Sequence, residues 1–375
     1  MAGEWRSSTW GEEISLEYGK ALRGYSEARG QYQVFGSNGP IGWTSHPLTQ
    51  GPGVILGRKG AYRRVHYSPD PFFVIDTAYF VVPRKQFDMR WLYYAIKHYK
   101  LGEIDDGSPV PSTTRAAVYM ISLKVPPLAE QRAIAGILGS LDDKIEANRR
   151  MNETLEAMAR AIFKSWFIEP ANDGLPKDWR ESTIGEEVRV VGGSTPSTGK
   201  PEYWEGGSVW WATPKDLSTL RSPVLLETER RITELGLAEI GSGLLPAGTV
   251  ILSSRAPIGY LAISEVPVAV NQGFIAMVCD KTLPPIYAWL WAEHFMETIK
   301  GRANGTTFQE ISKANFRPIP IMVPTSALID RFITIVNPLH RRIVKNLRES
   351  TALATIRDAL LPRLISGQIR LKNYV

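Results

Sequence analysis

The chain of 375 residues has few of the residues that build disulfides and metal sites. Cys279 is its single cysteine, so no internal disulfide can form, and the five histidines are scattered along the sequence. No His or Cys spacing resembles a metal-ligand pattern, so we expect no structural metal. Cys279 itself falls in an apolar run, where a buried and unreactive thiol is expected.

Long apolar runs are also missing. No stretch of about 18 apolar residues occurs, which argues against a membrane-spanning helix. The first residues, MAGEWRSSTW, lack the apolar centre of a secretory signal. We therefore expect a cytoplasmic chain without membrane contact. A hydrophobic content of 43% is enough for two cores of ordinary domain size.

Catalytic motifs are absent as well. Residues 193–201, GSTPSTGKP, have five residues between their glycines where a phosphate-binding loop needs four, and Pro201 replaces the Ser or Thr that would hold magnesium. Residues 70–73, DPFF, resemble the acidic tetrapeptide of amino-methyltransferases, but the second proline and a glycine-rich cofactor loop are missing. No nucleophile elbow is present either. We expect no catalytic centre in this chain.

The sequence does contain a long internal repeat. Residues 4–13 read EWRSSTWGEE and residues 178–187 read DWRESTIGEE, with seven of ten positions identical at an offset of 174. Residues 107–127 resemble residues 305–325 at an offset of 198, and each copy leads into a long helical pattern. A period near 200 predicts a duplicated domain plus helix, and hence a pseudo-two-fold molecule.

Each long helical pattern has an apolar seam. In residues 128–168 the apolar positions alternate in steps of four and three, which predicts a helix packed on another helix. The second copy repeats the seam, with Pro338 and Pro362 expected to bend or end that helix. A helix of about 40 residues would be about 60 Å long. The predicted helix-pairing residues are Ile134, Leu138, Leu141, Ile145, Asn148, Leu339, Ile343, Asn346 and Leu353.

Two asparagines interrupt the seam at equivalent places. A two-fold relation between the copies requires the helices to run antiparallel, which brings Asn148 and Asn346 together near their middles. A polar residue in an apolar seam costs stability and commonly sets the register of the pair. The alternative is that both asparagines face solvent.

The globular segments are rich in Gly, Pro, Trp and short β-branched runs, which predicts an α+β fold with much strand. The expected strands are 54–56, 73–82, 120–125, 250–252, 266–278 and 319–323, and the expected shorter helices are 88–99 and 285–300. The chain thus divides into two mixed, strand-rich domains, 1–126 and 171–325, separated by two long antiparallel coiled-coil helices, 127–170 and 326–375.

Charge is unevenly distributed over these four blocks. The net charge of +6 is the sum of +4 for residues 1–126, −1 for 127–170, −3 for 171–325 and +6 for 326–375. A basic last segment is compatible with polyanion contact, with a docking surface for another protein, or with a solvated helix face. Charge alone leaves these three open.

The first long helix carries a recognisable pattern. Residues 125–167, VPPLAEQRAIAGILGSLDDKIEANRRMNETLEAMARAIFKSWF, closely resemble the conserved region of type I restriction-modification specificity subunits. The resemblance extends over essentially the whole chain, because both globular blocks contain residues typical of the family's target recognition domains. In the first block these are Tyr18 to Lys20, Tyr32, Gly36 to Gly39, Gly57 to Gly60 and Asp76-Thr77; in the second they are Trp179, Gly192 to Pro196, Trp210, Thr213, Asp216-Leu217 and Gly305 to Thr307. Residues 324–330, PTSALID, depart from the Pro-Leu and Glu-Gln signature of the first copy.

The resemblance implies a DNA-reading subunit without a catalytic centre. Its two target recognition domains would read two different half-sites in double-stranded DNA, with the paired helices acting as a ruler for the spacer. In the family these helices dock two methylation subunits, which bring S-adenosylmethionine, and restriction subunits, which use ATP with Mg to translocate and cut DNA. No cofactor would then belong to this chain. A protein-interaction scaffold without sequence-selective DNA binding is one alternative, and a nuclease or methyltransferase acting alone, which the missing motifs argue against, is the other.

Loops that place glycine beside arginine or lysine are the expected DNA contacts, since they offer donors for phosphates and side chains long enough to reach base edges. Each of these residues could also be a solvated surface group, and the Gly-Thr-Thr stretch could be a structural turn. The candidates are Arg58, Lys59, Tyr62, Arg63, Arg115, Lys200, Lys215, Arg255, Thr306 and Thr307.

Overall fold

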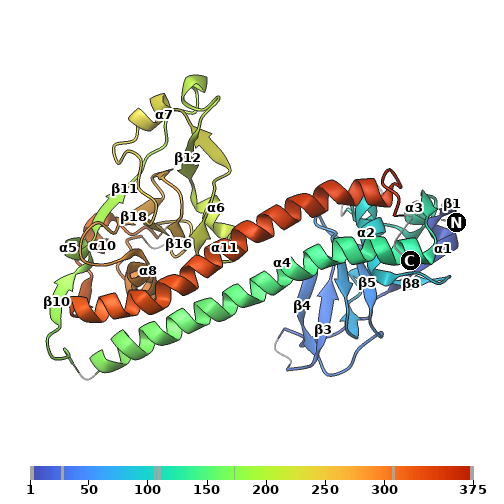
Figure 1. Cartoon of the computed structure of the whole chain (residues 1–375), viewed down its shortest axis with the longest axis horizontal. Helices are drawn as coiled ribbons and strands as arrows, with labels where there is room; N and C mark the ends of the chain where they lie inside the picture. Colours follow the sequence, from blue (N-terminus) through green and yellow to red (C-terminus); the bar gives the residue numbers. More distant parts are fainter. Residues whose placement is uncertain are drawn as a thin grey trace. The chain divides into compact units, whose positions relative to one another are not determined.

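Two compact units make up the chain. The computed structural model describes residues 4–26, 29–104, 107, 111–172, 174–305 and 309–371 (Figure 1). Unit 1 comprises Met1–Ala147 and Glu349–Val375, and unit 2 comprises Asn148–Arg348. Each unit therefore combines one globular block with one half of each long helix. This division differs from the four expected blocks, because each helix half packs into the core of the globular block in its own unit.

The described strands of unit 1 form three sheets, with strand orders β2-β8-β5-β6, β4-β3-β7 and β1-β9. Its strands are β1 (Arg6–Thr9), β2 (Ile14–Tyr18), β3 (Tyr32–Gly36), β4 (Gly39–Thr44), β5 (Gly53–Gly57), β6 (Val65–Ser68), β7 (Phe72–Val74), β8 (Ala78–Pro83) and β9 (Ser122–Val125). Its shorter helices are α1 (Trp10–Glu13), α2 (Met89–His98), the 3-10 turn η1 (Leu101–Glu103) and α3 (Arg115–Tyr119).

Unit 2 follows the same plan, with strand orders β11-β18-β15-β16-β13, β14-β12-β17 and β10-β19. Its strands are β10 (Arg180–Thr183), β11 (Arg189–Gly192), β12 (Val209–Ala212), β13 (Val224–Leu225), β14 (Arg230–Ile232), β15 (Val250–Ser253), β16 (Leu261–Ser264), β17 (Val268–Val270), β18 (Phe274–Val278) and β19 (Pro320–Val323). Its shorter helices are η2 (Lys164–Ile168), η3 (Glu169–Ala171), α5 (Ile184–Glu187), η4 (Pro201–Tyr203), α6 (Pro214–Ser218), α7 (Glu234–Ala238), α8 (Pro285–His294), α9 (Met296–Lys300) and α10 (Lys313–Phe316). The α+β class and the internal repeat are confirmed.

Four expected elements differ in detail. The expected strands 73–82 and 266–278 are each split, into β7 with β8 and β17 with β18, and the two halves belong to different sheets. Polar turns at Asp76-Thr77 and at residues 271–273 separate the halves, and the long β-branched runs concealed them. The expected helix 285–300 likewise breaks at Phe295 into α8 and α9. Strand β9 begins at Ser122 because α3 ends just before it.

The two long helices are α4 (Leu128–Phe163) and α11 (Ser326–Ile365), coloured green and red in Figure 1. In each unit their segments run antiparallel: Lys144 pairs with Glu349 at 3.4 Å in unit 1, and the Phe163 and Phe332 rings lie 6.1 Å apart in unit 2. Helix α11 does not end at either proline, since residues on both sides of Pro338 pack into the unit 2 core. Tertiary packing of this kind outweighs the local propensity.

The helix-pairing seam is buried unevenly. Ile134, Leu138, Ile343 and the asparagines are buried, whereas four other predicted members are half-buried: Leu141, Ile145, Leu339 and Leu353. Contact with a globular core does not by itself complete the burial, since Leu339 packs against the unit 2 core and is still partly exposed. Among the described residues, none of the helices combines the length and apolarity needed to cross a membrane.

The asparagines form a buried polar contact inside unit 2. Asn148 Nδ2 donates to the backbone oxygen of Asn346 at 3.4 Å, and Asn346 Nδ2 donates to Asn152 Oδ1 at 2.8 Å. Asn148 and Asn346 are 1% and 0% exposed. The solvent-facing alternative is therefore wrong, and the contact fixes which residues of the two helices lie opposite each other.

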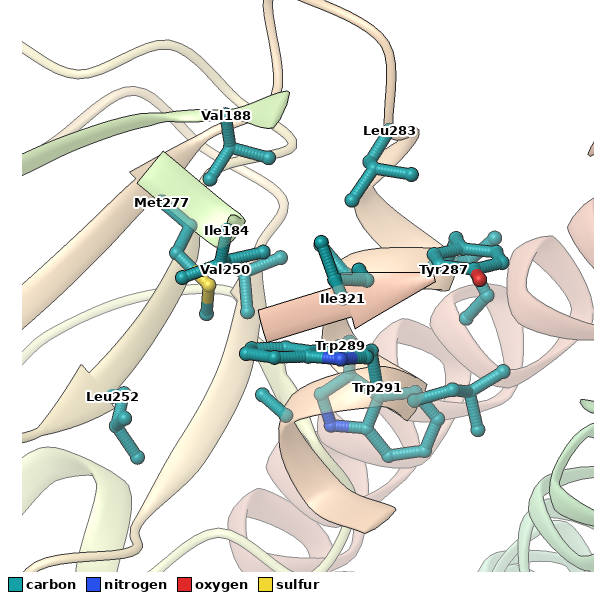
Figure 2. Close-up of a cluster of buried hydrophobic side chains, with 14 of the residues drawn as sticks. Ile184, Val188, Val250, Leu252, Met277, Leu283, Tyr287, Trp289, Trp291 and Ile321 are labelled. Carbon is teal, nitrogen blue, oxygen red and sulfur yellow. The ribbon is translucent and has the colours of Figure 1, made fainter. Parts of the chain in front are cut away.

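The unit 2 core is built around α8, which is buried on nearly all sides. Figure 2 shows Tyr287, Trp289 and Trp291 of α8 among side chains from the strands and α5. Helix α11 contributes Phe332, which is fully buried and lies 5.0 Å from the ring of Phe167 and 6.2 Å from that of Tyr287. The long helices are thus part of the domain cores as well as of the helix pair.

The repeated segments 4–13 and 178–187 have the same structural role. In unit 1, Arg6 and Ser8 hold the buried carboxylate of Glu13, and in unit 2 Arg180 holds Glu187 at 2.7 Å. Thr9 and Thr183 each begin their helix with a capping box. The repeated glycine is also explained, because a Cβ at Gly11 would lie only 2.9 Å from Tyr119 Cβ.

Acid should destabilise both units through these carboxylates. Hydrogen bonds from Arg6 and Ser8 lower the pKa of Glu13 to about 2, and the pKa of Glu187 is likewise about 2 because bonds from Arg180 and Ser182 outweigh burial. A lowered folded-state pKa stabilises the fold above the unfolded-state pKa, and this is lost as pH falls toward 2. Each of these two carboxylates contributes on the order of 2 kcal/mol to the free energy of unfolding at neutral pH. The contribution is reduced from what the pKa shift alone would give, because the arginine partners are partly exposed to solvent.

We expect the free energy of unfolding to fall between about pH 4.5 and pH 2, and Glu13→Gln to flatten this dependence in unit 1 alone. Acid unfolding followed by hydrogen exchange in each unit measures it. An unchanged pH profile in Glu13→Gln would contradict the assignment, and Asp70→Asn, which alters an exposed carboxylate of the same unit, is the matched control.

Candidate nucleic-acid interface

Four loops of unit 1 meet around the hydroxyl of Ser37. The backbone N–H groups of Arg58 and Lys59 donate to Ser37 Oγ at 3.3 and 3.2 Å, and Ser37 Oγ donates to the backbone oxygen of Thr77. The Arg58 N–H also donates to Thr77 O at 3.0 Å, and Thr113 N–H donates to Arg58 O at 2.9 Å. The glycine-containing loops singled out from the sequence are therefore brought together, and with the adjoining segment 18–20 we call them the unit 1 loop cluster (18–20, 36–39, 57–60, 74–78 and 111–115).

Two guanidinium groups lie against tyrosines in this cluster. Arg58 Cζ and Arg115 Cζ are 4.8 and 4.2 Å from the ring centre of Tyr18, which is 48% exposed. Arg58 Nη1 donates to Asp76 O at 2.9 Å. Burial, together with a hydrogen bond to Tyr18, raises the pKa of Tyr79 to about 12, so the Tyr79 phenol stays neutral beside the cations. A guanidinium stacked on a ring can still direct its in-plane N–H donors to phosphates or base edges, although Arg115 Nη2 also lies 3.6 Å from Glu17 Oε2.

The other candidates in unit 1 have different environments. Arg63 donates to the backbone oxygens of Gly60, Gly102 and Ile104 at 2.8, 3.0 and 3.1 Å, so its guanidinium is used to hold the protein's own loops. Tyr62 is 71% exposed, and Lys59 is exposed next to it. Lys59 and Tyr62 are free to meet a ligand at the cluster, whereas Arg63 supports the loop that carries them.

Unit 2 has an equivalent loop cluster, defined by three matching hydrogen bonds. Ser194 N–H donates to Val270 O at 3.1 Å, as Lys20 N–H does to Val74 O at 2.9 Å in unit 1. Ser254 N–H donates to Gly273 O at 2.8 Å, and Ile311 N–H donates to Ser254 O at 3.0 Å. These two bonds correspond to those of Arg58 and Thr113. The unit 2 loop cluster therefore consists of 193–195, 253–257, 271–273 and 310–313.

The side chains of the second cluster carry less available positive charge. Ser254 occupies the place of Arg58, and Arg255 pairs with Glu310 at 3.8 Å. Lys200 donates to Tyr203 Oη at 2.9 Å and Lys215 pairs with Glu229 at 2.6 Å, so each of these two candidates has a local partner. Thr306 and Thr307 lie outside the described residues.

Two residues of the clusters, Tyr18 and Lys313, were not among the DNA contacts predicted from the sequence. Lys313 begins α10 after the capping residue Ser312, as Arg115 begins α3 after Thr114, and the offset of 198 relates the two positions. Gly192 stands at the repeat position of Tyr18, and the Lys313 side chain passes 3.4 Å from where its Cβ would lie. The offset of 198 from the candidate Arg115 could have identified Lys313, whereas the counterpart of Tyr18 is a glycine that gave no such signal.

The side chains described for the two clusters are mainly hydrogen-bond donors and aromatic rings. Burial raises the pKa of Cys279 to about 12, so its thiol stays protonated at neutral pH. No group of three or more metal-ligating side chains lies together in the part of the chain that the structure describes. Clusters of planar cations and aromatic rings on exposed loops are suited to binding a polyanion.

Comparisons with known proteins point the same way. The family described as type I restriction modification DNA specificity domain matches residues 17–157 and 176–345. The type I restriction enzyme MjaIX specificity subunit of Methanocaldococcus jannaschii is 33% identical over 201 residues, which is 53% of this chain and 46% of that protein. The HindI specificity subunit of Haemophilus influenzae is 23% identical over 370 residues, covering 80% of each chain. The crystal structure of the S subunit from M. genitalium shares the fold, with a TM-score of 0.64 at 18% identity over 96% of both chains.

Proposed function

The chain belongs to the type I restriction-modification DNA specificity family, and from this premise we propose that it selects the DNA sequence on which a type I complex acts. The observation that supports the proposal best is the pair of equivalent loop clusters. Each presents exposed polar or cationic side chains on a backbone frame held by the same three hydrogen bonds. A common frame with variable side chains is what sequence-selective reading by two modules requires.

The target is bipartite and asymmetric. Arg58, Arg115 and Tyr18 in unit 1 correspond to Ser254, Lys313 and Gly192 in unit 2, so the two frames carry different donors. Arginine pairs best with guanine edges, while the exposed Gln272 of unit 2 offers an amide suited to adenine. Different side chains at equivalent places imply two different half-sites.

Chemistry would belong to partner subunits. We infer that this chain has no catalytic centre, and that two methylation subunits supply S-adenosylmethionine while restriction subunits use ATP and Mg. The long helices support a docking role, since large apolar side chains are exposed along them: Met151, Met158, Ile335 and Ile356 are 38 to 48% exposed. Such a subunit would act in the cytoplasm.

Co-expression with type I methylation subunits tests the proposal. The modified adenines of the host genome are then mapped by single-molecule sequencing, with the methylation subunits alone as the control. We expect one asymmetric two-part motif with a fixed gap. A stable complex that modifies no defined motif would overturn the proposal and leave a protein-interaction scaffold.

A further inference from the structure

Unit 2 carries a second group of cations, outside its loop cluster, on the small sheet β14-β12-β17. Arg230 Cζ lies 3.6 Å from the ring centre of Trp204 and 5.4 Å from that of Trp211. Arg231 Cζ lies 3.6 Å from the ring centre of Trp210. Both arginines are exposed. The distances place each guanidinium in van der Waals contact with an indole face.

The two tryptophans beneath Arg230 are held in place by hydrogen bonds and by contact with each other. Trp204 Nε1 donates to Ser197 O at 3.0 Å and Trp211 Nε1 donates to Ser194 O at 3.2 Å. The Trp204 and Trp211 rings meet edge to face at 5.0 Å. A ring held in this way fixes the plane of the guanidinium stacked on it, so less side-chain entropy is lost when that guanidinium binds a ligand.

These two cations also differ from their neighbours in charge pairing. Within the described residues, no carboxylate lies within 4.0 Å of either guanidinium, and the adjacent Glu229 is already bound by Lys215 at 2.6 Å. Other arginines of unit 2 do pair, as Arg189 does with Asp280 at 2.8 Å. The charges of Arg230 and Arg231 are thus available to an external anion.

The strand that carries them is an edge strand with a definite register. Strand β14 pairs only with β12 in its sheet, where Arg231 lies opposite Trp210 and Arg230 opposite Trp211. Successive residues of a strand point to opposite faces of the sheet. One guanidinium therefore lies on each side of the β14 edge.

We propose that the β14 edge is a DNA-backbone clamp of unit 2, in which Arg230 and Arg231 each bind phosphates of one of the two strands bordering a groove. The inference rests on the proposed function and adds the anchoring of the second half-site. Planar guanidiniums make bidentate bonds to phosphate oxygens, and stacking leaves their N–H edges free. The unit 2 loop cluster lacks a counterpart of Arg58, because Ser254 takes its place there, and an anchor outside the cluster would replace that donor.

The test uses the complex of the full chain with its methylation subunits and measures affinity for target DNA as a function of salt. Arg230→Gln/Arg231→Gln is compared with Lys281→Gln/Arg189→Gln, which removes two charges from surface positions of the same unit whose side chains are already bound by the protein's own groups. If each arginine makes one phosphate contact, the slope of log affinity against log salt falls by about 2. Affinity falls on the order of tenfold per contact at 0.1 M salt, equally for target and unrelated DNA. We expect the control variant to keep both the wild-type salt slope and the wild-type affinity.

A conservative variant separates anchoring from packing. Arg230→Lys/Arg231→Lys keeps both charges and covers the tryptophans with aliphatic chains, so we expect it to retain the wild-type salt slope and lose only part of the affinity. If the Gln double variant kept the wild-type slope and affinity, the clamp would be overturned and the proposed function would stand. The same would follow if the Lys double variant lost as much of the salt slope as the Gln double variant. A wild-type complex that binds no DNA would overturn both.

Discussion

An Arg58→Ala/Arg115→Ala variant is expected to bind its target at least about 30-fold more weakly, with the loss confined to one half-site. Each well-aligned arginine contact with a base is worth about 1–3 kcal/mol, so two amount to at least about 2 kcal/mol. Both guanidiniums lie on the exposed ring of Tyr18 in the unit 1 loop cluster. Affinities for duplexes with substitutions in one half at a time measure the effect.

The matched control is Lys124→Ala, which removes a positive charge from an exposed position of β9 in the same unit. We expect it to change affinity less than twofold. In the double variant, substitutions in the affected half should no longer matter, whereas those in the other half should cost as much as in the wild type. An equal loss of discrimination in both halves would refute separate reading by the two units.

Replacing Phe332 by alanine is expected to lower the free energy of unfolding of unit 2 by about 3–5 kcal/mol. Phe332 is fully buried, and its ring contacts those of Phe163, Phe167 and Tyr287. Removing it leaves a cavity where α11 meets α4 and the α8 core. Hydrogen exchange of the α8 amides measures the loss of stability in unit 2. Exchange of the α2 amides shows whether unit 1 is unaffected.

Ile335 is the control for this substitution, because it lies on the same helix and is 44% exposed. Ile335→Ala should change the stability of unit 2 by no more than about 0.5 kcal/mol. If Phe332→Ala were no worse than Ile335→Ala, the long helices would not belong to the domain cores, and the division of the chain into two units would be wrong.

The sequence predicted the long helices well because their seams extend over many turns. Strand ends were predicted less well, since the β-branched runs of 73–82 and 266–278 continue across turns and only three-dimensional pairing shows where each strand stops. Helix α8 gave little amphipathic pattern because it is buried on nearly all sides. The prediction that Pro338 or Pro362 could end α11 is wrong, because side chains before and after each proline pack into the unit cores and the helix continues.

For the candidate interface, glycine beside a cation identified the Arg58 loop, but the sequence could not distinguish Arg58 from Arg63. That distinction depends on Gly102 and Ile104, which lie about 40 positions away and accept the Arg63 hydrogen bonds. The stacks of Arg230 and Arg231 depend on the register between β12 and β14, so no local pattern reveals them. Lys313, in contrast, follows from the repeat offset alone.

Selection of bound duplexes from a randomised pool tests the central claim most directly, namely that each unit reads one half of the target with its own loop cluster. The complex is prepared with the wild-type chain, with Arg58→Ala and with Lys313→Gln. The account predicts a two-part motif for the wild type, relaxed in one half by Arg58→Ala and in the other half by Lys313→Gln. Relaxation of the same half by both variants, or of both halves by either, would contradict it.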